Sequence, residues 1–372
     1  MTKKIWNDSK GYVIIFIIAM FLLGGIATWF FLQDPYGSQR TLLFPDQDDY
    51  FMDFFNTLHY VADRNPYVNG YGGLVNRNYL PLGYMILYPF SQVDDFIRVL
   101  PKDLREWQGP IIACFTFLFI SVGSFLYLMY EGKKGRRIEK FFTTLACALS
   151  GIMLYNIDRA NTIILSAAAL LFFLLFYKDE KPVYRHLAYM ALAIAGALKV
   201  YPALFGVILL YEKRFKDAAY SILYGLVFVF LPFLFFEGGF SNVSKLIYNV
   251  GLNNAKYYGG TFSVISNTIF EARDYYPIGF MVGNIVLIIV LLLGWAQKKP
   301  WKQILLLTCG LVLTPVHSGY YCGLYLFIPL LFFLNEKDHK ATDLLYLIFF
   351  ILVLNPLQYS FFLPESSLLV EK

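Results

Sequence analysis

Apolar stretches separated by short polar segments run through almost the whole chain of 372 residues. The apolar stretches are roughly 15 to 22 residues long, which is the length an α-helix needs to cross the hydrocarbon core of a bilayer. Hydrophobic residues make up 58% of the chain and charged residues only 15%, in keeping with this pattern. The sequence therefore predicts an all-α, polytopic integral membrane protein with about 11 transmembrane helices.

Two polar segments are long enough to form substantial loops, residues 33–109 and 237–276. The other polar segments are too short to hold a separate soluble domain. We therefore expect a single transmembrane domain over residues 1–372 with two large loops.

Basic residues collect in the shorter polar segments and predict the topology. The chain begins with MTKK, and about 22 apolar residues follow soon after, too many for the core of a signal peptide, so this segment is interpreted as an uncleaved first span. Basic clusters recur at residues 131–140, 178–185, 212–216, 297–302 and 336–340. The positive-inside rule places these clusters and the amino terminus in the cytoplasm, and the two long loops on the non-cytoplasmic side of the cell membrane.

Residues 186–211 form an apolar stretch with basic segments on both sides. Because both sides are predicted to be cytoplasmic, the chain has to enter the membrane and return within this one stretch. Pro202, in the segment Lys199-Val-Tyr-Pro202, disfavours helix at the preceding residue and lacks the N–H that a continuing helix needs. The sequence therefore predicts two short helices that meet between Lys199 and Pro202 and line a cavity at the break.

Charge and cysteine pattern exclude several classes of function. The formal charge of +5 comes with Lys and Arg in the cytoplasmic segments, so we infer no nucleic-acid partner. The four cysteines are scattered with no Cys-x-x-Cys spacing, which favours neither a disulfide framework nor a zinc site. There is no Gly-rich nucleotide loop, and the sequence indicates no organic cofactor. A metal is not required either, although the acidic residues of the first long loop could bind one.

The first long loop concentrates acidic residues in a chain that otherwise avoids them, with five aspartates in DQDDYFMDFFNTLHYVADRNPY, residues 46–67. At helical spacing one side of this segment is apolar and the opposite side is polar. The apolar side comprises Phe51, Phe54, Phe55, Leu58, Val61 and Ala62, and the polar side Asp49, Asp53, Asn56, Tyr60 and Asp63. The pattern predicts an amphipathic helix that lies at the outer membrane surface.

The aspartates of this helix divide into two groups. Asp46 is suited to cap the amino end, and Asp48 and Asp49 then fall in the first turn, where negative charge favours the helix dipole. Asp53 lies two turns in and is not explained in this way. It belongs either to a solvated polar face or to the mouth of an intramembrane cavity, where a carboxylate can act as a general base.

Candidate cationic and polar partners are few. Lys199 is the one residue with a full charge that lies within the spans and clear of their ends. An ammonium group at a broken helix suits an anion such as phosphate, although a lysine that snorkels to the interface is the alternative. Arg159 and Asn161 fall in one short outer turn, where the alternative explanation is an interfacial anchor. His317 falls in another, where the alternative is an ordinary loop histidine. All are predicted on the same outer side as Asp53.

Several segments together carry a family resemblance. They are NPY at 65–67, NYLP at 78–81 followed by LGYMILYPF, DRAN at 158–161, GALKVYPALFGVILLYEKRFKDA at 196–218 and TPVHSGYY at 314–321. In this order they resemble the GT-C fold glycosyltransferases, and most closely the family 87 (GT87) branch, which includes bacterial mannosyltransferases that use polyprenyl-phosphate mannose. The segment Lys199-Val-Tyr-Pro202, with the apolar run and basic turn that follow it, is the most specific of these signals.

The resemblance implies a catalytic aspartate, which we assign to Asp53. Members of the branch usually show a more spaced Asp-Phe-x-x-Tyr pattern, with which Asp49 would align instead. The candidate residues for the donor phosphate are Lys199, Arg159 and His317, and those for other substrate contacts are Asn56, Tyr60, Asn161 and Tyr201.

The function that the resemblance implies is transfer of a hexose, mannose by analogy, from a polyprenyl-phosphate sugar donor to an envelope lipid or glycan acceptor, with an inverting displacement. The main alternative is a secondary transporter or lipid flippase. Such proteins often carry carboxylates within their spans, and this sequence has no Asp or Glu in the middle of a predicted span. A ligase that moves a larger glycan from a diphosphate-linked lipid is a further alternative. It would require more cations at the donor site.

Overall fold

The fold is all-helical, as predicted. The computed structural model describes residues 9–33, 50–69, 77–258, 276–313 and 320–357, and within these ranges it contains helices and no β-strand. The helices are α2 (Ser9–Gln33), α3 (Met52–Val61), α4 (Pro81–Leu87), η2 (Tyr88–Gln92), α5 (Pro101–Leu104), α6 (Gln108–Gly132), α7 (Arg137–Ala148), α8 (Gly151–Arg159), α9 (Ile163–Phe176), α10 (Pro182–Leu198), η3 (Tyr201–Gly206), α11 (Val207–Tyr211), α12 (Phe215–Phe230), η4 (Leu231–Phe235), η5 (Gly239–Ser241), α13 (Asn242–Tyr258), α15 (Tyr276–Ala296), α16 (Pro300–Leu313), η7 (Tyr320–Leu326), α17 (Phe327–Leu334), η8 (Ala341–Asp343) and α18 (Leu344–Leu354), where η denotes a 3₁₀-helix.

Three helices are long and apolar enough to cross a bilayer, at Lys10–Gln33, Gln108–Gly132 and Phe215–Phe235. A fourth candidate is the pair α7 and α8, which are bent by 57° at the break between them. The remaining apolar helices of the described residues are 10–17 residues long, shorter than the roughly 20 residues of a full crossing. The protein is therefore built for a membrane, while the expected number of about 11 spans stays a prediction.

The predicted helix break is confirmed. α10 ends at Leu198, Lys199 is extended with φ −144° and ψ 122°, and the chain continues as a 3₁₀-helix. The returning segment lies so close to α10 that a Cβ on Gly196 would be 3.2 Å from the Cβ of Ala203. A side chain at Gly196 would therefore crowd the place where the two arms of the break meet, and the break presents Lys199 at the end of a helix.

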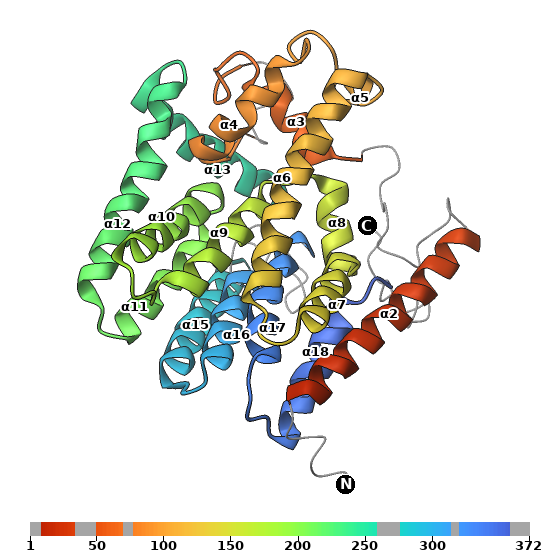
Figure 1. Cartoon of the computed structure of the whole chain (residues 1–372). Coiled ribbons are helices and arrows are strands. Elements are labelled where there is room, and N and C mark those ends of the chain that lie inside the picture. Colours follow the sequence, from red (N-terminus) through yellow and green to blue (C-terminus); the bar gives the residue numbers. More distant parts are fainter. Residues whose placement is uncertain (1–8, 34–49, 70–76, 259–275, 314–319, 358–372) are drawn as a thin grey trace.

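The helices of the first long loop lie at one end of the molecule. In Figure 1, α3, α4, α5 and α13 gather at the top, and α2 begins at the opposite end. The two long loops also bind each other, because Asn249 of α13 donates to the carbonyl oxygens of Tyr67 and Arg77, both at 3.2 Å. They form a single layer over this end of the helices.

The apolar side of α3 packs on protein and not on the membrane surface, so this part of the prediction is wrong. Phe54 and Phe55 are fully buried. The ring centroid of Phe54 lies 5.9 Å from that of Phe90 and 5.3 Å from that of Phe117. The ring centroid of Phe55 lies 6.4 Å from that of Phe96. A helical apolar stripe shows that one side is buried, but both lipid and a protein core satisfy it equally.

The start of α3 also differs from the prediction. The helix begins at Met52, so Asp53 lies in its first turn and not two turns in. Its carboxylate is therefore near the positive end of the helix dipole. Asp46, predicted as the cap, and Asp48 and Asp49, predicted in the first turn, lie outside the described residues.

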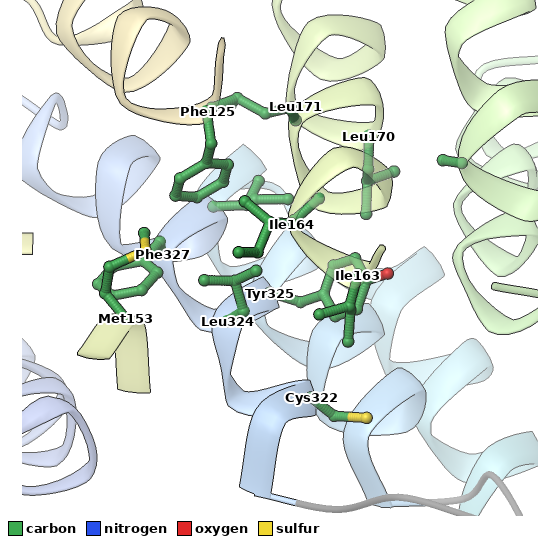
Figure 2. Packing of buried hydrophobic residues seen from close by; sticks show 14 of the residues in the cluster. Phe125, Met153, Ile163, Ile164, Leu170, Leu171, Cys322, Leu324, Tyr325 and Phe327 are labelled. Carbon is green, nitrogen blue, oxygen red and sulfur yellow. The ribbon is translucent and has the colours of Figure 1, made fainter. Parts of the chain in front are cut away.

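A buried apolar core lies around α9 (Figure 2). Its labelled members are Phe125, Met153, Ile163, Ile164, Leu170, Leu171, Cys322, Leu324, Tyr325 and Phe327. One polar chain crosses this core: the hydroxyl of Tyr325 donates to Ser166 Oγ at 2.8 Å, and Ser166 Oγ donates to the carbonyl of Ala195 at 2.9 Å. These bonds join η7, α9 and the last turn of α10, and they fix the helix end that presents Lys199.

Candidate active site

The site begins where the end of α8 meets the start of α3. The backbone N–H of Phe51 donates to the carbonyl of Asp158 at 2.6 Å. Phe51 has φ 56° and Ala160, which follows α8, has φ 49°. Left-handed backbone costs a non-glycine residue about 1 kcal/mol or more, so both helix ends are held by their surroundings. As a result Asp53 and Arg159 face the same space.

Asp53 and Arg159 form a bidentate ion pair. Arg159 Nε donates to Asp53 Oδ2 at 2.7 Å, and Nη2 donates to Oδ1 at 2.7 Å. The side chains are 16% and 23% exposed, respectively. Two parallel charge-assisted hydrogen bonds of this length, shielded from water, are among the stronger polar contacts in proteins.

Asn161 supplies a third donor to the same carboxylate. Its Nδ2 lies 2.7 Å from Asp53 Oδ2 and 3.3 Å from the hydroxyl of Tyr79. Its Oδ1 accepts the backbone N–H of Ile163 at 2.9 Å, at the start of α9. Because a backbone N–H can only donate and a carboxylate can only accept, this arrangement fixes the orientation of the amide.

Lys199 is the second cation of the site. Its Nζ lies 4.3 Å from the ring centroid of Tyr79 and 5.8 Å from that of Tyr321. Among the described residues, no hydrogen-bond acceptor and no carboxylate lies within bonding distance of this Nζ. The ammonium group therefore rests on two aromatic rings, which stabilise a cation without neutralising it.

Tyr79 joins the two halves of the site. Its hydroxyl accepts from Asn161, the partner of Asp53, while its ring carries the ammonium of Lys199. Burial raises the pKa of the Tyr79 hydroxyl well above its ordinary value, so the group stays protonated. Tyr321 has a similar position, since the guanidinium of Arg159 lies 5.7 Å from its ring.

Tyr79 and Tyr321 were not among the residues predicted for the site. Both lie in segments that carry the family resemblance, NYLP at 78–81 and TPVHSGYY at 314–321. Tyr79 follows Asn78 and Tyr321 follows Tyr320, and an aromatic side chain within each of these two motifs is the signal that would have identified them.

The structure brings together four of the predicted residues, Asp53, Arg159, Asn161 and Lys199, around Tyr79. Tyr201 lies deeper, with its hydroxyl 3.4 Å from Cys322 Sγ. The remaining predicted residues are Asn56 and Tyr60, which lie on the same helix as Asp53, and Asp49 and His317, which lie outside the described residues.

An apolar groove of about 520 Å³ leads away from the site. Its walls come from α10, η3, α11 and α12, and small residues such as Gly206 and Gly225 keep it open. At one end it contacts Leu80 and Val200, the residues next to Tyr79 and Lys199. Val200 and Ile222, which line it, are 66% and 65% exposed, so the groove opens on the outside of the helix bundle.

No cluster of three or more His, Cys, Asp or Glu side chains suited to a metal ion occurs in the part of the chain that the structure describes. The groups that the site itself offers are a carboxylate, a guanidinium and an ammonium group.

Comparison with known proteins identifies the family. The model of glycosyltransferase family 87 matches residues 79–315, more than half of the 372 residues. The match begins at Tyr79 and includes Arg159, Asn161 and Lys199, while Asp53 lies before it. Searches among curated proteins and among solved structures gave no match. With this match over the cationic half of the site, the chain belongs to glycosyltransferase family 87 and is a membrane glycosyltransferase.

Proposed function

We propose that the enzyme transfers a hexose, with mannose as the first candidate, from a polyprenyl-phosphate-linked donor to a lipid or glycan acceptor of the cell envelope. The observation on which this proposal rests is the position of Lys199. A half-buried ammonium group that has no acceptor among the described residues, one aromatic ring away from a carboxylate, is suited to an anionic group that arrives with the substrate.

A phosphate monoanion or diester fits this position. Phosphate oxygens accept charge-assisted hydrogen bonds from ammonium and guanidinium groups, and both kinds of group are present here. When the sugar–phosphate bond breaks, negative charge grows on the departing phosphate. Cations fixed in advance in a site with little water stabilise that charge most effectively, so Lys199 assists the leaving group as well as binding.

The groove beside Lys199 supports a lipid-linked donor. An isoprenoid attached to a phosphate at Lys199 would extend past Val200 and lie in the apolar groove, which is open on the outside of the helix bundle. Burial of apolar surface contributes about 0.8 kcal/mol per CH₂ group, so even part of an isoprenoid adds substantially to binding. A nucleotide-linked donor would have no use for such a groove.

Asp53 is proposed as the general base. It takes the proton of an acceptor hydroxyl, whose oxygen attacks the anomeric carbon opposite the phosphate. The bond from carbon to the phosphate oxygen then breaks, and the configuration is inverted. The proposal includes a GT-C-like arrangement of about 11 spans in the cell membrane, with a cytoplasmic amino terminus and the site on the non-cytoplasmic side.

The test is a transfer assay with purified protein in lipid nanodiscs. Synthetic polyprenyl phosphates carrying radiolabelled mannose, glucose or galactose are incubated with an extract of envelope lipids and glycans, and nucleotide sugars are tested in parallel. We expect labelled product from a polyprenyl-phosphate hexose and none from nucleotide sugars. Product from a nucleotide sugar alone would refute the proposed donor.

A further inference from the structure

The carboxylate of Asp53 is almost fully occupied by donors. Its Oδ2 accepts from Arg159 Nε and Asn161 Nδ2, and its Oδ1 accepts from Arg159 Nη2. A carboxylate offers about four acceptor positions, so about one is left, on Oδ1. A group in this state is well held but poorly placed to take a proton from an acceptor hydroxyl.

Arg159 is placed between two possible partners. Its guanidinium pairs with Asp53 on one side and lies 5.7 Å from the ring of Tyr321 on another. The ammonium of Lys199 lies 5.8 Å from that same ring. An anion held by Lys199 near Tyr321 therefore approaches the second cation, and a phosphate is as good a bidentate partner for a guanidinium as a carboxylate is.

We propose that Arg159 changes partners during each turnover: it is paired with Asp53 while the donor site is empty, and it turns to the donor phosphate once Lys199 has bound it. The change frees the carboxylate only when a donor is in place. Arg159 is then a positioning residue for Asp53 before binding and a ligand of the leaving group during transfer. This inference rests on the proposed function and adds an order of events to it.

The consequence is an ordered reaction. With Arg159 on the phosphate, Asp53 keeps Asn161 as its donor and has free positions on both oxygens for an acceptor hydroxyl. The proton passes from that hydroxyl to the carboxylate, and the electron pair of the broken sugar–phosphate bond stays with the phosphate, next to Lys199 and Arg159. Product release returns Arg159 to Asp53.

The charged and titratable groups around Asp53 come from four parts of the fold. Arg159 comes from α8, Lys199 follows α10, Tyr79 precedes α4 and Tyr321 lies in η7. Arg159 is the one cation of this described set that bonds to the carboxylate directly. It is therefore the group whose movement changes the state of Asp53.

Binding of polyprenyl phosphate without a sugar tests the exchange, because no chemistry follows. The Kd is measured by scintillation proximity for the wild type, Asp53→Asn, Arg159→Gln and the double variant. Removing the carboxylate releases Arg159, so Asp53→Asn should bind about tenfold more tightly, and Arg159→Gln about tenfold more weakly. In the Arg159→Gln background, Asp53→Asn should bring no gain, which gives a large coupling in the double-mutant cycle.

A structural role of the ion pair predicts a different result. If the pair only holds α3 and α8 together, Asp53→Asn weakens binding or leaves it unchanged, and that result overturns the exchange. Asp103→Asn is the matched control, because it removes an exposed aspartate of the same loop and should leave Kd unchanged. A wild type that neither binds polyprenyl phosphate nor transfers sugar refutes the proposed function. If the wild type does both but Asp53→Asn does not bind polyprenyl phosphate more tightly, only the exchange is refuted.

A second measurement needs no variant and covers the case in which Asp53→Asn does not fold. A hydrophobic carbodiimide labels carboxyl groups that are not held by a cation, and mass spectrometry measures the labelled fraction of Asp53. Adding polyprenyl phosphate should raise this fraction several-fold. An unchanged or lower fraction, with binding confirmed on the same sample, overturns the exchange.

Discussion

The two halves of the site differ in whether their charged group has a partner among the described residues. Asp53 is bound by three donors from Arg159 and Asn161, whereas Lys199 lies on the rings of Tyr79 and Tyr321 with no acceptor among the described residues. A paired carboxylate is stable without substrate, but a half-buried ammonium group that has no acceptor among the described residues gains most when an anion arrives. The carboxylate half is thus paired within the described structure, whereas the ammonium half leaves room for the anionic donor that we propose.

Removing the carboxylate should have the largest effect on catalysis. We expect Asp53→Asn to lower kcat by about 10² to 10⁴, because general-base catalysis contributes an effect of this size. The amide keeps the shape of the side chain, so the donor should still bind. Single-turnover transfer with saturating polyprenyl-phosphate hexose measures the loss.

The matched control for this variant is Asp103→Asn, whose carboxylate is exposed on α5. Its turnover should equal that of the wild type. If Asp53→Asn retained near-normal turnover, the carboxylate half would be structural only, and the base would have to be sought at Asp49.

Removing the ammonium group should act on binding before catalysis. Lys199→Met keeps the length and apolar stem of the side chain and loses the charge. We expect the Kd for polyprenyl phosphate to rise about 10- to 100-fold, since a hydrogen bond to a charged group contributes about 1.5–3 kcal/mol. Lys102→Met, at an exposed position of α5, is the control and should bind normally. Equal loss in both variants would mean that surface charge and not the site attracts the donor.

The members of the site could be predicted one by one, but their pairing could not. Lys199 was identified because a full charge in an apolar stretch is rare, and Arg159 and Asn161 because the sequence predicts a short outer turn at their positions. The sequence gives no sign that Arg159 binds Asp53, since the two residues are far apart along the chain and any cation could neutralise that carboxylate. The contact depends on the junction of α3 and α8 at Phe51.

The fold could be predicted from the sequence at positions where a single residue constrains the backbone of its neighbours. Pro202 marks the break after α10 because proline acts on the residues directly around it. The bend between α7 and α8 was missed, although Ser150 caps α8 by accepting the N–H of Met153, and a Ser-Gly pair in an apolar run is a signal for a new helix start. The surroundings of α3 were not predictable, because its stripe of phenylalanines suits lipid and protein alike.

The apolar groove beside the ammonium half of the site is expected to bind the donor through shape and not through charge. Gly225 lines the groove on α12, and a Cβ placed there meets nothing within 4 Å. Gly225→Leu should therefore fill the groove without disturbing the backbone, and the added side chain displaces part of an isoprenoid. We expect binding of a long polyprenyl phosphate to fall about five- to tenfold, as loss of one or two buried CH₂ groups implies. A short, water-soluble prenyl phosphate should bind as it does to the wild type.

Gly123→Leu is the control for the groove. Gly123 lies on α6, a Cβ there also meets nothing within 4 Å, and the residue does not line the groove. Both variants add the same side chain to a glycine inside an apolar helix. If they changed binding equally, or if Gly225→Leu weakened the short donor as much as the long one, the groove would not hold the isoprenoid.

The smallest effect should come from the residue that joins the two halves. Tyr79→Phe keeps the ring under Lys199 and removes the hydroxyl that accepts from Asn161, a bond of 3.3 Å. Because Asn161 still donates to Asp53 at 2.7 Å, we expect a loss in kcat of about two- to fivefold, in line with one neutral hydrogen bond, and an unchanged donor Kd. Tyr79→Leu removes the ring as well and should raise the Kd about three- to tenfold, the size of a partly shielded cation–π contact. Measuring both constants for both variants separates the two roles: if Tyr79→Phe weakened donor binding as strongly as Tyr79→Leu, the hydroxyl and not the ring would be the contact that serves Lys199, and the two halves would not be independent.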